Sequence, residues 1–155
     1  MIKRITVKDI RITLTIAKIA KVVGVNSELD DGNHIVMWDF DDVPLGDVKD
    51  ALRRVQTRFL LSDILILRSS EPDNYLAYCF TSMDWRRAVM IVAETEHVDY
   101  QFFRFGVYRG HFTLRVGPKS KNKPYLVSRL DGYELPDCSV NELDSWVKYE
   151  TLSWR

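Results

Sequence analysis

The feature of this sequence that most constrains its fold is a pair of apolar segments joined by a short, turn-forming stretch. The segments Asp63 to Arg68 and Tyr75 to Phe80 have the composition and length of buried strands. Residues 69–74 between them are two serines, Glu, Pro, Asp and Asn, which are residue types that favour turns. Because so short a connection joins antiparallel strands rather than parallel ones, the sequence predicts a β-hairpin.

Three further segments have a clear pattern. The apolar run Ile35 to Trp38 is typical of a strand that is buried on both faces. Pro44 suits the first turn of a helix, and the apolar residues after it follow one helical face down to Leu61. Ser82 can cap a second helix, which we expect to end near Glu96.

The patterns toward the two ends of the chain are less regular. Apolar residues from Val7 to Val23 recur close to helical spacing, although part of this segment also alternates like a strand, and we favour a helix. Segments 111–116 and 125–130 predict two strands of a second hairpin, joined by the polar loop 117–123. The Ser-Val-Asn-Glu sequence of residues 139–142 has capping-box spacing and predicts a final helix that docks on the core.

Together these elements predict one α+β domain over residues 1–155, with a mixed, mostly antiparallel sheet flanked by helices. A chain of 155 residues, 46% of them hydrophobic, is long enough to bury one core. Its 22 Lys and Arg residues balance its 22 Asp and Glu residues, so no overall positive field attracts a polyanion. Any affinity for nucleic acid must therefore be local.

Two observations bear on where the protein works. Cys79 and Cys138 lie far apart and have neither the spacing of a zinc module nor that of a disulfide framework. The apolar residues near the N-terminus are interrupted by charged ones, a pattern that fits neither a signal peptide nor a membrane span. We therefore expect a reduced, cytoplasmic protein with no membrane partner.

The sequence Asp39-Phe40-Asp41 directly follows the apolar run Ile35 to Trp38. In a strand both carboxylates point to one side and Phe40 to the other. Two neighbouring carboxylates repel each other unless a cation lies between them, and oxygen ligands of this kind suit Mg²⁺ or Mn²⁺. The sequence thus predicts a divalent-metal site, with a solvated acidic turn as the alternative.

Charge is segregated along the chain. The segment from Glu28 to Asp50 holds eight acidic residues and one Lys, whereas Tyr100 to Leu130 holds seven basic residues and no acidic one. Aromatic residues are interleaved with the basic ones, as binding of a phosphate backbone and stacked bases would require. The alternative is that the aromatic residues belong to the core and the charges to a solvated face. The candidate nucleic-acid contacts are Arg104, Arg109, His111 and Lys121.

The order of these segments resembles the catalytic core of archaeo-eukaryotic primase-polymerases, including small plasmid and phage replication primases. That family has an apolar strand ending in Asp-x-Asp, a helix, a strand-turn-strand with a Ser-x-His or similar signature, and a later apolar-Asp element. Here the segments Ile35 to Asp41, Ser69 to Tyr78 and Val98-Asp99 follow that order. Leu76 stands where the family pattern has His.

The resemblance covers roughly residues 35–125 and implies a primase-polymerase-like domain with an RRM-like core. It implies that Asp39, Asp41 and Asp99 are catalytic and hold Mg²⁺ or Mn²⁺ for nucleotidyl transfer on a single-stranded DNA or RNA template. Other partners would be nucleoside triphosphates and a replicative helicase or another replication protein. The residues implied in nucleotide binding are Ser69, Ser70, Asn74, Arg115, Lys119 and Lys123.

Two alternatives stay open. In the family the missing His contacts the nucleotide phosphates, so Leu76 also fits a catalytically inactive module that binds single-stranded nucleic acid or a replication partner. The opening Asp39-Phe40-Asp41-Asp42-Val43 also resembles haloacid-dehalogenase-like phosphatases, with Asp39 as nucleophile and Asp41 as general acid and base. Ser69, Lys119 and Asp131 would complete that second site.

Overall fold

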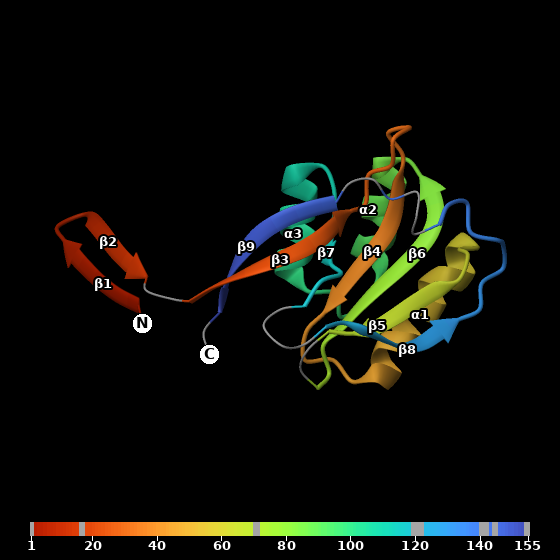
Figure 1. The fold of residues 1–155 in the computed structure, drawn as a ribbon, viewed down its shortest axis with the longest axis horizontal. Coiled ribbons are helices and arrows are strands. Elements are labelled where there is room, and N and C mark those ends of the chain that lie inside the picture. The colour runs from red at the N-terminus through yellow and green to blue at the C-terminus, as the bar shows by residue number, and fades with distance from the viewer. Residues whose placement is uncertain are drawn as a thin grey trace.

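The computed structural model describes residues 2–15, 18–69, 72–118, 123–139, 143 and 146–153. Its largest sheet has four strands in the order β4-β6-β5-β8, and every neighbouring pair is antiparallel. The strands are β4 (His34–Phe40), β5 (Ile64–Arg68), β6 (Tyr75–Met83) and β8 (Tyr125–Leu130) (Figure 1). The predicted hairpin is thus confirmed as β5 and β6, and the α+β fold class is confirmed with it.

The first three strands form a split βαβ unit. Because β4 and β5 are both antiparallel to β6, they run parallel to each other, and α1 (Leu45–Phe59) connects them. The helix predicted from Pro44 onward is this α1, and Pro44 is its N-cap residue. Gln56 on α1 joins the helix to the far strands, since its side-chain amide donates to the carbonyl oxygens of Ser62 and Leu130.

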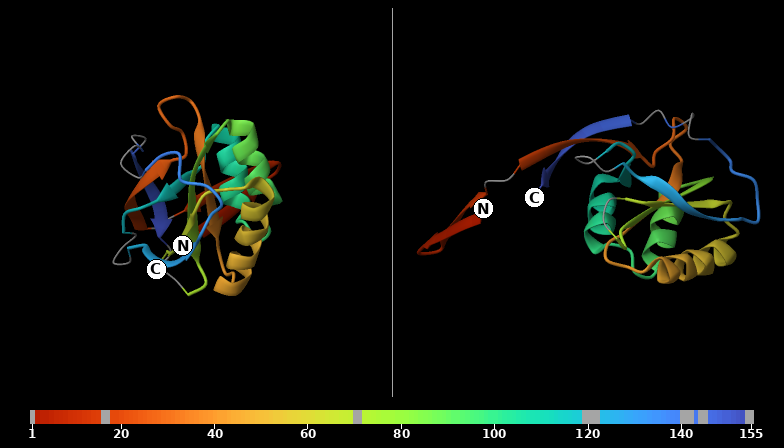
Figure 2. Two further views of the ribbon diagram at one scale, coloured as in Figure 1. Left: turned by 90° about the vertical axis from the view of Figure 1, so that its right-hand side faces the viewer. Right: turned by 60° about the horizontal axis from the view of Figure 1, so that its bottom comes forward.

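Helices cover one face of this sheet (Figure 2). The second predicted helix is α2 (Trp85–Glu94), but Asp84 rather than Ser82 caps it, by accepting a hydrogen bond from the backbone N–H of Arg87. The indole N–H of Trp38 on β4 donates to the hydroxyl of Thr95 at the end of α2. A helix that the sequence did not predict, α3 (Tyr100–Arg109), follows α2 directly.

A second, three-stranded sheet has the order β7-β3-β9, and its strands are antiparallel. They are β3 (Lys18–Asn26), β7 (Thr113–Arg115) and β9 (Trp146–Ser153). The predicted hairpin of 111–116 with 125–130 is wrong, because β7 pairs with β3 whereas β8 pairs with β5. The two segments therefore lie in different sheets.

The predicted helix from Val7 to Val23 is also wrong. This segment contributes to β1 (Ile2–Val7), β2 (Ile10–Thr15) and β3, and its Ile, Val and Thr content favours strands. Among the described residues β1 and β2 pair only with each other, and Figure 1 shows this hairpin standing apart from the rest. The predicted final helix fails as well, since Trp146 and Val147 begin β9 and residues 140–142 lie outside the described ranges.

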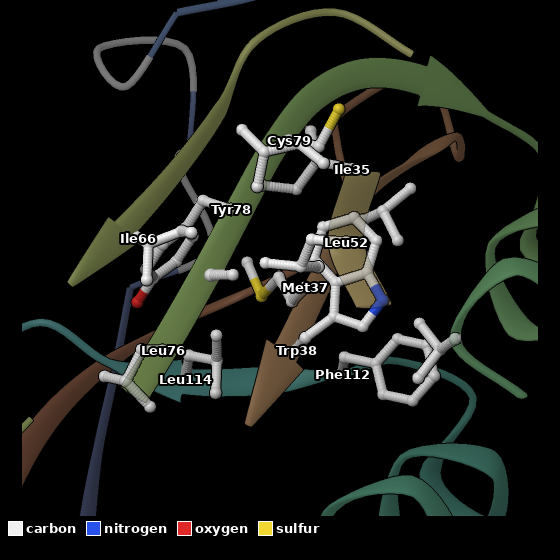
Figure 3. Close-up of a cluster of buried hydrophobic side chains, with 14 of the residues drawn as sticks. Ile35, Met37, Trp38, Leu52, Ile66, Leu76, Tyr78, Cys79, Phe112 and Leu114 are labelled. Atoms are coloured by element: carbon white, nitrogen blue, oxygen red, sulfur yellow. The ribbon is translucent and has the colours of Figure 1, made fainter. Parts of the chain in front are cut away.

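The hydrophobic core lies between the two sheets and also between the four-stranded sheet and the helices that cover it. Side chains from β4, β6, α1 and the β7 region meet in one buried cluster (Figure 3). The largest of its fully buried side chains are Trp38, Tyr75, Phe40 and Phe112. Among the described residues, no helix is both long and apolar enough to cross a membrane.

Candidate functional site

Asp39 lies near the end of β4, on the face of the sheet away from α2. The neighbouring Trp38 points toward α2, where its indole N–H meets Thr95, so strand alternation turns Asp39 to the opposite face. Leu76 on β6 is the cross-strand partner of Asp39 and lies on the same face. Asp39 is half-buried and Asp41 is exposed, so the acidic pair spans the boundary between the core and solvent.

A third carboxylate reaches this point from a distant part of the chain. The backbone N–H of Asp99 donates a hydrogen bond of 2.8 Å to the backbone carbonyl oxygen of Asp39. Asp99 is also the N-cap residue of α3, and its Oδ1 accepts a hydrogen bond from the backbone N–H of Phe102 at 2.6 Å. The connection between α2 and α3 therefore brings Asp99 to the end of β4.

The electrostatics of Asp39 follow from this arrangement. Burial is the main reason, and the negative charges of Asp41 and Asp99 are a further reason, why the pKa of Asp39 is raised from its usual 3.8 to about 7. The positive charge of Arg115 acts in the opposite direction and lowers that pKa. Near neutral pH, Asp39 is thus close to half protonated, and a nearby cation would favour its ionised form.

Arg115 comes to the site on β7, which pairs with β3. Its backbone carbonyl oxygen accepts a hydrogen bond of 3.2 Å from the hydroxyl of Tyr78 on β6, so this strand is held against the sheet that carries Asp39. Three separate segments thus contribute charge to one place: the end of β4, the start of α3 and the end of β7. Sequence reasoning had grouped these residues only through a family resemblance.

The turn between β5 and β6 is tied to the loop that follows the acidic pair. The side-chain Oδ1 of Asn74 accepts a hydrogen bond of 2.8 Å from the backbone N–H of Asp42, and the backbone N–H of Val43 donates to the carbonyl oxygen of Asp73. Ser69 is buried, and its backbone N–H donates to the carbonyl oxygen of Asn74. In this structure Asn74 therefore positions the loop at Asp42.

The strand register of the four-stranded sheet shows which of the predicted site residues lie at the same end of that sheet. Phe40 pairs with Tyr75, Tyr75 with Arg68, and Arg68 with Tyr125, so the ends of β4 and β5 lie level with the starts of β6 and β8. Lys123 precedes β8 and so belongs to the acidic end of the sheet. The remaining predicted nucleotide-binding residues, Ser70 and Lys119, lie outside the described ranges, as does the candidate nucleic-acid contact Lys121.

The same register separates the residues of the phosphatase alternative. Leu130 pairs with Ile64 at the start of β5, so Asp131 follows the opposite end of the sheet from Asp39. There the carbonyl oxygen of Asp131 accepts a hydrogen bond from Arg53 on α1. The antiparallel β5-β6 hairpin also differs from the alternating parallel βαβ units that the phosphatase fold requires.

Two of the four predicted nucleic-acid contacts lie on α3. Arg104 and Arg109 are exposed on this helix, while His111 follows it and lies near His34 at the beginning of β4. The helix does have a sequence signal, because Asp99 at its N-cap and Gly110 at its C-cap bracket residues 100–109. Gly110 has a φ of 80°, a left-handed conformation that glycine adopts readily.

Carboxylate oxygens in a half-buried, mutually repelling set are suitable donors for Mg²⁺ or Mn²⁺. The three aspartates meet the chemical requirement, since the negative charges of Asp41 and Asp99 add to burial in raising the pKa of Asp39, and a cation would offset that negative charge. Within the described ranges, however, His, Cys, Asp and Glu side chains do not form a ready group of three or more around one point. One oxygen of Asp99 is engaged in capping α3, so the residues best placed to bind a cation first are Asp39 and Asp41.

Comparison with protein-family models finds no match for this chain, and neither the curated proteins nor the solved structures yield one.

Proposed function

We propose that this chain is a metal-dependent nucleotidyl-transfer domain of the primase-polymerase type, which acts on a single-stranded template. The observation that carries the proposal is the meeting of Asp39, Asp41 and Asp99 beside Arg115 at one end of the four-stranded sheet. Asp99 is 60 residues from Asp39 in the sequence, so no local turn accounts for their meeting. A half-buried carboxylate close to two others costs stability, which favours a functional reason for the cluster.

In this mechanism Asp39 and Asp41 would hold Mg²⁺ or Mn²⁺, while Asp99 positions the end of β4 through its backbone hydrogen bond. When bound there, the cation would offset the negative charge of the phosphates and the charge that develops on the attacking oxygen. Arg115 adds a fixed positive charge on the same face, suited to a triphosphate. Lys123 lies at the same end of the sheet, where it can meet the leaving pyrophosphate or the template.

The reaction follows from the position of these groups. The primer 3′-hydroxyl oxygen bonds to the α-phosphorus of a nucleoside triphosphate, while the bond from that phosphorus to the bridging oxygen breaks and pyrophosphate leaves. The hydroxyl proton passes to solvent. The chain would contribute by positioning and by charge, with Arg115 and Lys123 binding the phosphates and the aspartates holding the cation.

The test is a calorimetric titration of Mn²⁺ with and without a non-hydrolysable nucleoside triphosphate. The wild type should bind Mn²⁺ and bind it more tightly with the triphosphate, while Asp39→Ala/Asp41→Ala should lose both effects. Asp47→Ala/Asp50→Ala is the matched control, because it removes two exposed carboxylates of α1 and should behave like the wild type. Absence of Mn²⁺ binding by the wild type would refute the proposal.

One observation favours a second candidate, the inactive module that binds single-stranded nucleic acid or a replication partner. Leu76 is only 3% exposed and is the cross-strand partner of Asp39, so an apolar side chain occupies the position from which a His could contact a phosphate. Template-dependent incorporation of nucleotides separates the two candidates. A chain that binds single-stranded DNA equally well after Asp39→Ala, and that extends no primer with Mn²⁺ present, is the inactive module.

A further inference from the structure

The helix that begins at the acidic site exposes a row of aromatic and basic side chains. Tyr100 directly follows Asp99 and is 66% exposed, and Tyr108 near the end of α3 is 88% exposed. Between them lie the exposed residues Arg104 and Phe105. Large aromatic side chains are usually buried at least in part, so exposure of three along one short helix calls for a functional explanation.

Helical spacing arranges these residues into a stripe. Tyr100, Arg104 and Tyr108 recur at intervals of four residues, which places them above one another on one side of α3 over about 12 Å. Phe105 and Arg109 form a neighbouring row, in which the guanidinium of Arg109 lies 5.6 Å from the centre of the Phe105 ring. We define the α3 stripe as these five residues.

The direction of α3 connects the stripe to the candidate site. Asp99 at the beginning of α3 is hydrogen-bonded to Asp39 near the end of β4. After the other end of α3, the carbonyl oxygen of Phe112 accepts a hydrogen bond from Ser27, whose hydroxyl contacts His34 at the beginning of β4. The helix α3 therefore runs in the opposite direction to β4. The α3 stripe extends away from the acidic cluster formed by Asp39, Asp41 and Asp99.

The core of the protein does not use these side chains. A different face of α3 packs inward, where Phe102 stacks on the buried Phe112 at a centroid distance of 5.1 Å. Gly106 on that face leaves room for the Phe112 ring, because an added Cβ would overlap it. The aromatic rings of the α3 stripe are thus additional to those that fix the helix in place.

The charge of the stripe indicates the kind of partner. On the neighbouring helices Arg54 and Arg58 of α1 form ion pairs with Glu96 and Glu94. By contrast, within the described part of the chain neither arginine of the α3 stripe forms an ion pair. The helix α2, which contacts α3, also exposes Arg86 and Arg87. Positive charge alternating with exposed rings complements an anionic backbone that carries flat, apolar groups.

We propose that the α3 stripe binds single-stranded polynucleotide, with bases stacked on Tyr100 and Tyr108 and phosphates held by Arg104 and Arg109. This inference rests on the proposed function in one respect, since it assigns the bound strand as the template or primer that leads to the acidic site. Duplex binds more weakly than single strand, because paired bases cannot stack on the tyrosines. Mn²⁺ strengthens binding by offsetting the repulsion between the three aspartates and the nearest phosphates.

The experiment measures fluorescence anisotropy of a labelled oligothymidylate, first in the presence of a chelator so that the metal site plays no part. Tyr100→Ala and Tyr108→Ala should each weaken binding about tenfold, whereas Tyr100→Phe and Tyr108→Phe should retain it. The affinity falls as salt rises, and Arg104→Ala and Arg109→Ala should each reduce the magnitude of the slope of log affinity against log salt by about 0.7. Tyr133→Ala and Arg58→Ala are the exposed controls from other parts of the surface, and they should bind like the wild type.

The outcomes separate this inference from the proposed function. If Tyr108→Ala and Arg104→Ala bind oligothymidylate as well as the wild type, the α3 stripe is not the binding surface, whatever the Mn²⁺ titration gives. If both weaken binding but the wild type binds no Mn²⁺, the stripe stands and the nucleotidyl-transfer proposal falls. Equal affinity for duplex and single strand would overturn the stacking on the tyrosines. Thermal unfolding of each variant checks that the fold is retained, as the exposure of these side chains predicts.

Discussion

Asp99 donates its backbone N–H to the carbonyl oxygen of Asp39, and its own side chain caps α3 by accepting a hydrogen bond from Phe102. One residue thus fixes both the end of β4 and the beginning of α3. The carboxylate of Asp99 is held close enough to raise the pKa of Asp39. The cap and the charge are separate properties of Asp99, and substitutions can remove one without the other.

We therefore predict that Asp99→Asn and Asp99→Ala differ in stability but agree in electrostatics. Asn caps a helix about as well as Asp does, whereas Ala loses the cap at a cost of about 1 kcal/mol in the free energy of unfolding. Both substitutions remove a negative charge and should lower the pKa of Asp39. Urea unfolding and a carboxyl NMR titration of Asp39 measure the two effects. An unchanged pKa in both variants would show that Asp99 does not act on Asp39 through its charge.

The raised pKa of Asp39 predicts how stability depends on pH. In the folded state this pKa is about 7, against an ordinary value of 3.8. Between these values the folded state holds a proton that the unfolded chain has lost, so stability falls as pH rises from about 4 to about 7. Asp39→Asn should remove this loss and be more stable than the wild type at pH 8, by on the order of 2 kcal/mol, with a smaller difference at pH 5.

Urea unfolding of the wild type and Asp39→Asn at pH 5 and pH 8 provides the measurement. Asp47→Asn is the control, because Asp47 is exposed in the first turn of α1 and should show no comparable gain at pH 8. Mn²⁺ should stabilise the wild type at pH 8 and leave Asp39→Asn unchanged. The interpretation fails if Asp39→Asn is less stable than the wild type at pH 8 in the absence of metal.

Local sequence patterns correctly predicted those elements whose type is determined by residues within the element rather than by distant strand pairing. The helix after Pro44, the β5-β6 hairpin and α2 each have a clear periodicity or turn signal, and each is present. The segment from Val7 to Val23 fits two periodicities, and the choice is settled by pairing of β3 with β9, more than 100 residues away. A single-sequence pattern carries no information about so distant a partner.

The candidate site likewise has one part that local sequence patterns predict and another part that depends on distant segments coming together. Strand alternation predicted that Asp39 and Asp41 share a side, since it needs only the two neighbouring residues. That Arg115 reaches Asp39 depends on β7 pairing with β3 rather than with β8, which the pattern of polar loop and strands did not reveal. The structural role of Asn74, which holds the backbone of Asp42, likewise required the turn to fold back on the end of β4.

We predict that replacing Gly106 of α3 by a larger residue lowers the stability of the protein. A Cβ at this position would lie 2.5 Å from Cε1 of Phe112 and closer still to Cδ1, and Phe112 is fully buried. Gly106→Ala should therefore destabilise the protein by about 1–3 kcal/mol through overpacking. Gly46→Ala in α1 is the matched control, because a Cβ there meets no atom within 4 Å and alanine favours the helix. Equal urea midpoints for Gly106→Ala and the wild type would contradict the packing of α3 on Phe112.

Leu76 offers the most direct experiment on how the acidic cluster works. Its side chain belongs to the buried cluster that also contains Leu114, so Leu76→Ala should cost about 2–5 kcal/mol and Leu76→Met less than about 1.5 kcal/mol. Leu76→His places a titratable ring opposite Asp39, where the protonated form favours the ionised carboxylate. The pKa of Asp39 should therefore fall in Leu76→His and stay raised in Leu76→Met.

The same pair of variants tests the nucleotide site. If the cluster binds a triphosphate, Leu76→His should bind a non-hydrolysable nucleoside triphosphate more tightly than Leu76→Met, because the new ring lies on the face that carries Asp39 and Arg115. Calorimetry with Mn²⁺ present measures both affinities, and Leu76→Met controls for the change in packing. Equal or weaker binding by a folded Leu76→His would mean that phosphates do not approach Leu76, and would favour a role for the cluster that involves no triphosphate.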